Sequence, residues 1–331
     1  MLQVLRKIAF PISLIYALVV YLRNFLFDTG VFKSKSFSTP TVCVGNISVG
    51  GTGKTPMTEF ILRMLIDKKV AVLSRGYKRK SEGYVLADES STVLDLGDEP
   101  FQIHKKFPQV RVAVDGDRRN GIENLERTVK PEIIVLDDAM QHRWVKPTMT
   151  ILLTAYSKLY VNDWYLPTGD LRDAKIAAKR ADVIVVTKCP DSISEEEKKN
   201  ITLNLHPESH QKVLFACLSY ADFISDGTQR IPLSSLKKES FALVTGIASP
   251  EPLVQYLKSL GLEFEHFQFG DHHHFTDEEL KRFSGFNQIL ATEKDFVRLA
   301  GRVEQLFYLE VAHQFNESDS SFLKESLQRL F

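Results

Sequence analysis

One short stretch, Thr41–Pro56, constrains the fold of this chain more than any other, and it reads TVCVGNISVGGTGKTP. Thr41–Val44 is apolar and rich in β-branched residues, which predicts a buried strand. A loop with four glycines follows, and Lys54 and Thr55 then lead into a predicted helix over Pro56–Lys68. Strand, glycine-rich loop, Gly-Lys-Thr and helix in this order are typical of a P-loop.

The residue types in this loop suit the binding of phosphate groups. Mostly small residues allow consecutive backbone N–H groups to curl around phosphate oxygens, and the helix start adds further N–H groups. The Lys54 ammonium can reach the β- and γ-phosphates, and the Thr55 hydroxyl can ligate Mg²⁺. The residues expected to line the phosphates are Ser48, Val49, Gly50, Gly51, Thr52, Gly53, Lys54 and Thr55. Ser48 stands where the full pattern has its first glycine, so an ordinary glycine-rich turn is the alternative.

A second motif, which is acidic, fits the same kind of site as the P-loop. Ile133–Leu136 is a run of four apolar residues that predicts a buried strand, and Asp137 and Asp138 follow it directly. A carboxylate at a strand end across from a P-loop holds Mg²⁺ directly or through water. The spacing leaves open which of the two aspartates takes the metal. Gln141 and His142 come next and belong to the same expected crevice.

Three further segments carry residues that either take part in a site or are plain structure. Tyr77 follows a predicted strand, Val70–Leu73, at the edge where ligands of open α/β sheets bind. Asp98 and Glu99 precede a predicted helix, where acids also occur simply as helix-start charges. Arg172 lies in the turn-rich loop LPTGDLRD.

A run of three histidines, His272–His274, lies between a predicted strand and a predicted helix. Adjacent residues of a turn point in different directions, and no further ligand stands nearby at zinc spacing, so a structural metal is not favoured. A histidine that partners a carboxylate across a cleft suits the titration range of the imidazole better.

The segment Thr187-Lys188-Cys189-Pro190-Asp191 is similar to the guanine-reading [NT]KxD of GTPases, but its aspartate comes one residue late. We interpret this segment as the end of a strand and a turn with a structural role.

Composition excludes several classes of protein. Lys and Arg together number 42, as do Asp and Glu, so the net charge is zero. No overall excess of positive charge therefore indicates a protein that binds nucleic acid. Cys43, Cys189 and Cys217 form no disulfide or zinc pattern, which favours a reducing compartment.

The N-terminal segment differs from the rest of the chain. Ile8–Leu22 is almost wholly apolar and is flanked by Arg6, Lys7 and Arg23. The run is shorter than the ~20 apolar residues of a transmembrane helix, and no small-residue cleavage site follows it. We expect a helix that lies in a membrane interface, with a core helix of a soluble protein as the alternative.

The order of predicted elements indicates an α/β fold with a P-loop NTPase-type, mostly parallel sheet flanked by helices. A smaller C-terminal α/β domain, joined by a two-stranded connection, completes the prediction. We expect an N-terminal membrane-associated helix over 1–32, a P-loop core over 33–212, the connection over 213–240 and the small domain over 241–331.

Taken together and in order, the motifs of this chain resemble the tetraacyldisaccharide 4′-kinase family of lipid A biosynthesis. Ala139 and Met140 depart from the family, which often has a glycine and an aromatic residue at these positions. The motifs that carry the resemblance are VGNISVGGTGKTP, SRGY, GDEP, LDDAMQH, LPTGDLRD, VTGIASP, GDHHHFT and ATEKDFVRL.

The resemblance implies an ATP-dependent kinase that phosphorylates the 4′-hydroxyl of an acylated disaccharide 1-phosphate. It implies Asp98 as the base, His272 as its orienting partner and Lys54 as a catalytic cation. His273 and His274 remain open as alternatives to His272.

The resemblance also implies the ligand-binding residues. Thr55, Glu99 and Asp138 would serve Mg²⁺, and Asp137 would join or replace Asp138.

Five further residues receive binding roles from the same resemblance. Gln141 would order the nucleotide, Arg172 would meet phosphate, and Asn46, Tyr77 and His142 would line the acceptor side.

The family works on the cytoplasmic face of the bacterial inner membrane, so membrane lipids are expected partners and nucleic acid is not. We further expect a monomer. The main alternative is a membrane-tethered P-loop GTPase or ATPase that acts as a switch, and a second is a lipid-binding scaffold with a degenerate P-loop.

Overall fold

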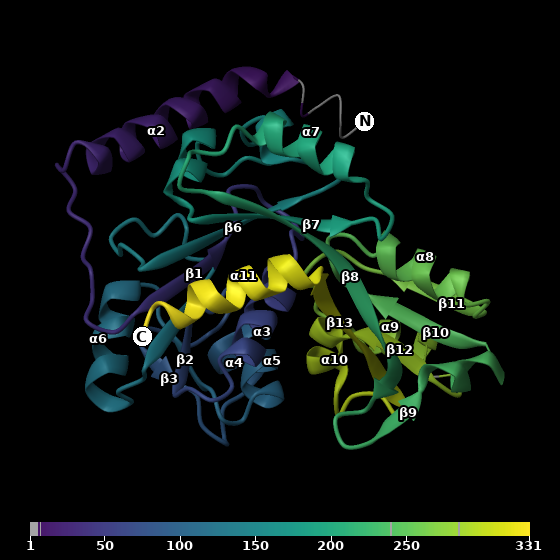
Figure 1. Cartoon of the computed structure of the whole chain (residues 1–331). Helices are drawn as coiled ribbons and strands as arrows, with labels where there is room; N and C mark the ends of the chain where they lie inside the picture. Colours follow the sequence, from purple (N-terminus) through teal and green to yellow (C-terminus); the bar gives the residue numbers. More distant parts are fainter. Residues whose placement is uncertain (1–5, 7, 239, 284) are drawn as a thin grey trace.

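The computed structural model describes Arg6 and residues 8–238, 240–283 and 285–331. Residues 1–5 and Lys7 of the expected N-terminal segment lie outside the described residues. The strands of the described part join in one sheet of thirteen strands, in the order β11-β10-β12-β13-β8-β7-β6-β1-β5-β2-β4-β3, with β9 beside β8. Helices lie on both faces of this sheet (Figure 1). The predicted α/β fold with a mostly parallel sheet is therefore confirmed.

The strands alternate with helices along most of the chain. The strands are β1 (Thr41–Gly45), β2 (Val70–Ser74), β3 (Val85–Leu86), β4 (Arg111–Val114), β5 (Ile133–Asp137), β6 (Met149–Ala155), β7 (Val183–Cys189), β8 (Lys212–Ser225), β9 (Arg230–Pro232), β10 (Phe241–Thr245), β11 (Phe264–Gln268), β12 (Ile289–Thr292) and β13 (Leu306–Phe315). The α-helices are α2 (Phe10–Asp28), α3 (Lys54–Met64), α4 (Val93–Leu96), α5 (Asp98–Lys106), α6 (Arg118–Thr128), α7 (Glu195–Leu205), α8 (Glu251–Ser259), α9 (Asp277–Phe283), α10 (Glu293–Leu299) and α11 (Glu317–Gln328). Short 3₁₀ helices cover Tyr160–Asn162, Lys175–Arg180 and Leu233–Lys238.

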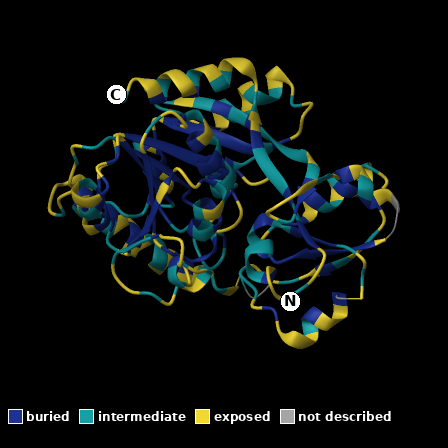
Figure 2. Ribbon diagram, turned by 90° about the horizontal axis from the view of Figure 1, so that it is seen from below, coloured by how far each residue is buried: buried dark blue, intermediate teal, exposed yellow. Residues whose placement is uncertain are grey.

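The strand of the P-loop lies in the middle of the first half of the sheet. β1 pairs in parallel with β5 on one side and β6 on the other. Side chains alternate along a strand, so Val42 and Val44 pack with α3, α5 and α11 on one face, whereas Cys43 packs with α6 and α7 on the other. Figure 2 shows the strands as buried and the outer helices and loops as largely exposed. This two-sided burial fixes the loops at the carboxyl ends of β1 and β5.

The predicted pair of strands between the two halves is present, because β8 and β9 pair antiparallel. β8 is longer than the predicted Val213–Leu218, since its residues up to Ser225 pair antiparallel with β13. Its first residues pair in parallel with β7. One strand thus belongs to both halves, and the sheet continues without a break from the P-loop half to β10–β13.

A buried group of charges also joins the two halves. Lys106 at the end of α5 makes an ion pair with Glu293 of α10 and lies 3.2 Å from Glu310 of β13. Its ammonium is also 2.7 Å from Glu59 of α3. This cluster holds the first turn of α10 against α5, the helix that begins with Asp98.

The polarity of helix α2 is inverted relative to an ordinary amphipathic surface helix. Its small and polar residues face the protein: Ser13 bonds Thr168 at 2.8 Å, and Asn24 donates to Asp173 at 2.8 Å. Most of its large apolar residues face outward, with Leu18 65% exposed, whereas Val20 and Phe27 are buried. Within the described residues, α2 is the one helix long and apolar enough to cross a membrane. The alternative of a buried core helix is therefore wrong.

Candidate active site

The P-loop takes its shape from two glycines and from a neighbouring loop. Gly50 and Gly53 have φ values of 104° and 83°, a region that L side chains rarely adopt. The Val49 N–H donates to the carbonyl of Asp170 at 2.7 Å, and the Asn46 side-chain amide donates to the Thr52 hydroxyl at 2.8 Å. The loop is therefore held from outside, while helix α3 begins directly at Lys54 and Thr55.

Lys54 points toward the acids that follow β5. Its Nζ atom lies 3.4 Å from Asn46 Oδ1 and 3.8 Å from Asp138 Oδ2. Arg172 reaches the same carboxylate, with Nη1 donating to Asp138 Oδ2 at 3.0 Å, and also bonds the Asn46 carbonyl. Burial alone would raise the pKa of Asp138, but Lys54 and Arg172 outweigh it and hold that pKa below its usual value. Two cations and one acid thus line the mouth of the P-loop.

Asp137 has a different environment from its neighbour. It is buried and accepts a hydrogen bond from the Ser74 hydroxyl at 2.9 Å. Burial, Asp138 and Glu99 together raise the pKa of Asp137 to about 6. A buried carboxylate surrounded by further acids, with one hydroxyl donor, fits a divalent cation, which would favour its ionised form. Thr55, Glu99, Asp137 and Asp138 therefore suit the Mg²⁺ site that the sequence predicts.

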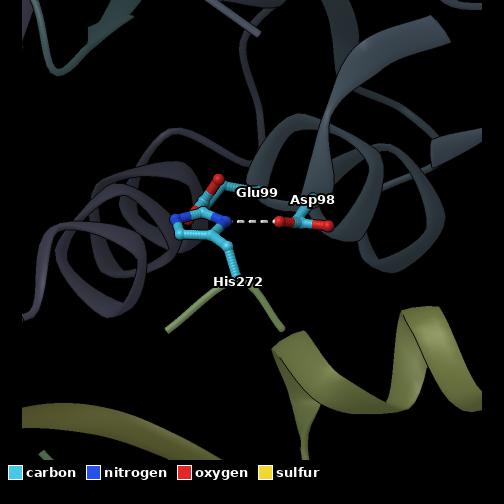
Figure 3. A group of neighbouring side chains, drawn as sticks. All are labelled: Asp98, Glu99 and His272. Atoms are coloured by element: carbon cyan, nitrogen blue, oxygen red, sulfur yellow. Dashed lines mark hydrogen bonds and ion pairs between the residues drawn. The ribbon is translucent and has the colours of Figure 1, made fainter. Parts of the chain in front are cut away.

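Asp98 and His272 meet across the two halves of the sheet, as Figure 3 shows. Asp98 begins α5, whereas His272 lies in the loop after β11 and has a φ of 59°. His272 Nδ1 lies 2.7 Å from Asp98 Oδ2, and Nε2 lies 3.8 Å from Glu99 Oε1. Ligand atoms of these three residues all lie within 4.8 Å of one another, so the group could also hold a metal ion.

The two other histidines of the run have different surroundings, and His274 is exposed. His273 Nε2 lies 2.9 Å from Glu279, and its ring stacks on Phe269. Glu279 also accepts from the Thr276 N–H, just before the start of α9. His272 is therefore the one that the fold brings to Asp98.

Two cations of α10 that sequence reasoning did not assign to the site contact this pair. Arg298 Nε donates to Asp98 Oδ1 at 2.8 Å, and Nη1 donates to the His273 carbonyl at 3.1 Å. Lys294 Nζ lies 3.0 Å from both Glu99 Oε1 and His272 Nε2. Their spacing of four residues on one helix face was the available signal, but charges at this spacing are also common on solvated faces.

These contacts set the protonation of the pair. Burial would raise the pKa of Asp98, but hydrogen bonds from His272 and Arg298 and the Arg298 charge hold it well below its usual range. Lys294 Nζ lies 3.0 Å from His272 Nε2, and Arg298 Nη2 lies 2.9 Å from Nδ1, so a cation faces each ring nitrogen while Nδ1 also contacts Asp98. The site therefore contains an ionised Asp98 beside an imidazole whose orientation is fixed by Asp98, Arg298 and Lys294.

The remaining predicted site residues lie around these two groups. Gln141 Nε2 donates to the Asn46 carbonyl at 2.8 Å, next to Lys54. The Tyr77 ring is largely exposed and meets the His272 ring edge-on, with centroids 5.1 Å apart. Burial and the nearby Arg118 lower the pKa of His142 to about 4. Asn46, Gln141 and Arg172 thus belong to the P-loop group, Tyr77 belongs to the Asp98 group, and Glu99 beside Asp137 connects the two.

His313 on β13 is a further contact that the sequence did not indicate. Its Nε2 lies 2.9 Å from the Gly53 carbonyl, so the C-terminal half of the sheet touches the P-loop itself.

Comparisons with known proteins agree with this arrangement. The family model described as tetraacyldisaccharide-1-P 4′-kinase matches residues 5–330. A tetraacyldisaccharide 4′-kinase of Flavobacterium johnsoniae is 48% identical, covering 98% of this chain and 99% of that protein. One of Bacteroides thetaiotaomicron is 44% identical over 89% of this chain and 83% of that protein.

A solved structure shares the fold over its whole length. It is the "apo" form of LpxK from Aquifex aeolicus in complex with ATP, with a TM-score of 0.80, 30% identity and 99% of each chain covered. With a family model matched over nearly all of its length and relatives at this level of identity, the chain belongs to the tetraacyldisaccharide-1-P 4′-kinase family.

Proposed function

We propose that this chain transfers the γ-phosphate of ATP to the 4′-hydroxyl of a tetraacyldisaccharide 1-phosphate in lipid A biosynthesis. Family membership supports this reaction. The observation that carries it is the meeting of two groups in one place: the P-loop with Lys54 and Asp138, and the Asp98–His272 pair from the facing half. A kinase needs the first group for the donor and the second for the acceptor hydroxyl.

Phosphoryl transfer requires mainly positioning and neutralisation of charge. Lys54 and Arg172 would neutralise the phosphate oxygens, since both now contact Asp138 at the mouth of the P-loop. Thr55, Glu99, Asp137 and Asp138 would hold Mg²⁺. When bound, the metal neutralises charge on the β- and γ-phosphates.

Asp98 is the proposed base, oriented by His272. Its depressed pKa means that it is ionised at physiological pH and ready to accept a hydrogen bond from the sugar hydroxyl. A weakly basic carboxylate suits a loose transition state, in which the hydroxyl proton is transferred late. Lys294, 3.0 Å from His272 Nε2, helps to hold the imidazole in its orientation toward Asp98.

The acceptor is proposed to lie on the open side of this pair. Tyr77 is exposed there, and Asn46 lies beside Lys54. His142, which faces Asp117 at the start of α6, is proposed to line the acceptor side as well. Arg172 is near enough to Asp138 to meet phosphate.

Helix α2 supports membrane attachment, which we propose to be on the cytoplasmic face of the inner membrane. Its outward apolar side would enter the lipid interface, while its polar side holds the loop that carries Arg172, through Tyr16 and the Arg172 carbonyl at 3.1 Å. A lipid substrate remains in the bilayer, so the active site must be brought to it. We propose a monomer divided at 1–32, 33–212, 213–240 and 241–331.

The test is transfer of label from γ-labelled ATP to a purified disaccharide 1-phosphate in mixed micelles, with product separated by thin-layer chromatography. The proposal expects label in the glycolipid. Release of label only as inorganic phosphate would support the switch alternative, which the family match over residues 5–330 does not favour.

A further inference from the structure

The segment Thr187–Asp191, which sequence reasoning interpreted as a plain turn, lies beside the P-loop. It ends β7, and β7 is two strands away from β1, on the side opposite to β5. Carboxyl ends of parallel strands form one edge of a sheet, which is where open α/β folds bind ligands. The segment is therefore part of the nucleotide crevice by topology.

Direct contacts fix this segment to the P-loop. The fully buried Thr187 hydroxyl donates to the carbonyl of Thr52 at 2.8 Å. A Cβ atom added to Gly51 would lie 3.7 Å from Lys188 Nζ and 3.8 Å from Ala248 Cβ. The Lys188 ammonium thus lies along the outer flank of the loop, next to the C-terminal half.

Lys188 has the features of a residue held for a ligand. Its φ of 58° is sparsely populated for a residue with a side chain, and such backbone strain clusters at functional sites. Burial lowers the pKa of Lys188, and Glu251 opposes this only in part. In the described part of the chain, Lys188 Nζ makes no hydrogen bond or ion pair, whereas Lys54 and Lys294 both face carboxylates. A largely buried ammonium that makes no hydrogen bond, and whose charge Glu251 offsets only in part, is costly unless a ligand supplies an acceptor.

The direction of the nucleotide indicates which part of it Lys188 meets. Asp137 and Asp138, which follow β5, and Glu99 beside Asp137 lie on one side of β1, so the transferable phosphate must face that side. The nucleoside, at the other end of the triphosphate, must then leave over β6 and β7, where Lys188 lies.

We propose that Lys188 binds the nucleoside part of the bound nucleotide, with Thr187 holding the segment against the P-loop. The ammonium donates to ribose or base acceptors, and the aliphatic stem covers one face of the base. Asp191 takes no part in nucleotide binding, because its side chain contacts the Cys217 thiol of β8 instead. This assignment rests on nucleotide binding by the P-loop, a part of the proposed function, but not on the identity of the acceptor.

Two probes separate a nucleoside contact from a phosphate contact. Binding of ATP and of inorganic tripolyphosphate, each with Mg²⁺, is measured by calorimetry on the full chain. In Lys188→Met we expect the Kd for ATP to rise ~10-fold, the usual worth of one charge-assisted hydrogen bond. The Kd for tripolyphosphate should stay within about twofold, whereas Lys54→Ala should weaken both ligands. Lys212→Met, at the exposed start of β8, is the matched control.

Steady-state kinetics give the second readout. Lys188→Met should raise the KM for ATP with kcat at saturating ATP unchanged, because the contact is the same in ground and transition states. Lys188→Gln, which keeps a polar head group, serves if the methionine variant unfolds. An unchanged Kd for ATP overturns the proposal, and so does equal weakening of ATP and tripolyphosphate. If the wild-type protein binds ATP but leaves the glycolipid unlabelled, the proposed kinase reaction is refuted. The comparison of ATP binding by the Lys188 variants still decides the role of Lys188 in that case.

Discussion

Replacing Asp98 by Asn should lower kcat for phosphoryl transfer by ~10²–10⁴-fold, which is the usual worth of a positioned base. This loss corresponds to about 3–5 kcal/mol of transition-state stabilisation. The affinity for ATP should stay near that of the wild type. The reason is structural: Asp98 contacts His272 and Arg298, whereas Lys54 contacts Asn46 and Asp138.

The same substitution also affects stability, and the two effects must be separated. Asp98 and Arg298 are 7% and 8% exposed, so Asn at position 98 leaves a nearly buried guanidinium without its ionic partner. Removing one partner of a buried pair costs about 3–5 kcal/mol of unfolding free energy. Replacing both partners costs less, because no charge is left unpaired. The double variant Asp98→Asn with Arg298→Met should therefore melt higher than Asp98→Asn alone.

The assay compares kcat at saturating ATP for both variants, at a temperature where circular dichroism shows them folded. Calorimetry with ATP and Mg²⁺ on the same preparations gives the nucleotide affinity. We expect the double variant to regain stability without regaining kcat. The reasoning is refuted if Asp98→Asn keeps kcat within about fivefold, if the double variant recovers it, or if ATP binding is lost.

Three other predictions concern single features of the structure. His272→Gln should lower kcat by ~10–100-fold at unchanged ATP affinity, whereas His273→Gln should leave kcat near wild type and lower only the melting temperature; a larger effect of the second variant on kcat would contradict the pairing. Deletion of residues 1–30, or Leu18→Glu on the exposed face of α2, should release the protein from anionic vesicles in a sedimentation assay, and full retention would argue against the anchor. Burial lowers the pKa of His313 from its usual 6.5 to about 4, so the unfolded chain binds more protons in that window and stability falls as pH drops from 6.5 to 4. Relative to wild type, His313→Gln should lose less stability over that range in thermal melts, and parallel pH curves would contradict this.

The P-loop half of the candidate site follows from local sequence. The P-loop and the acids after β5 are contiguous motifs, and each lies where one strand ends and the next element begins. The chemistry of such motifs depends on backbone geometry within a few residues, which glycine content and hydrophobic runs specify. The same holds for α2, whose apolar run predicted a helix in this part of the chain.

The acceptor half depended on contacts between distant segments. Arg298 and Asp98 lie on different halves of the sheet, and only the joining of β8 to β13 brings α10 beside α5. In the sequence, Lys294 and Arg298 are ordinary helix charges. Likewise, the aspartate in the segment of Lys188 comes one residue later than in the guanine-reading motif. Only the order of the strands shows that this segment lies two strands from β1.

By itself, the sequence determined the α/β class, the phosphate-binding loop and the acids that face it, since these follow from local periodicity and short motifs. The tertiary structure decided which histidine meets Asp98, which cations hold that pair and what lies beside the outer flank of the loop. The physical reason is that burial and pairing of charges depend on how far-apart elements pack, and spacing along the chain does not specify that packing.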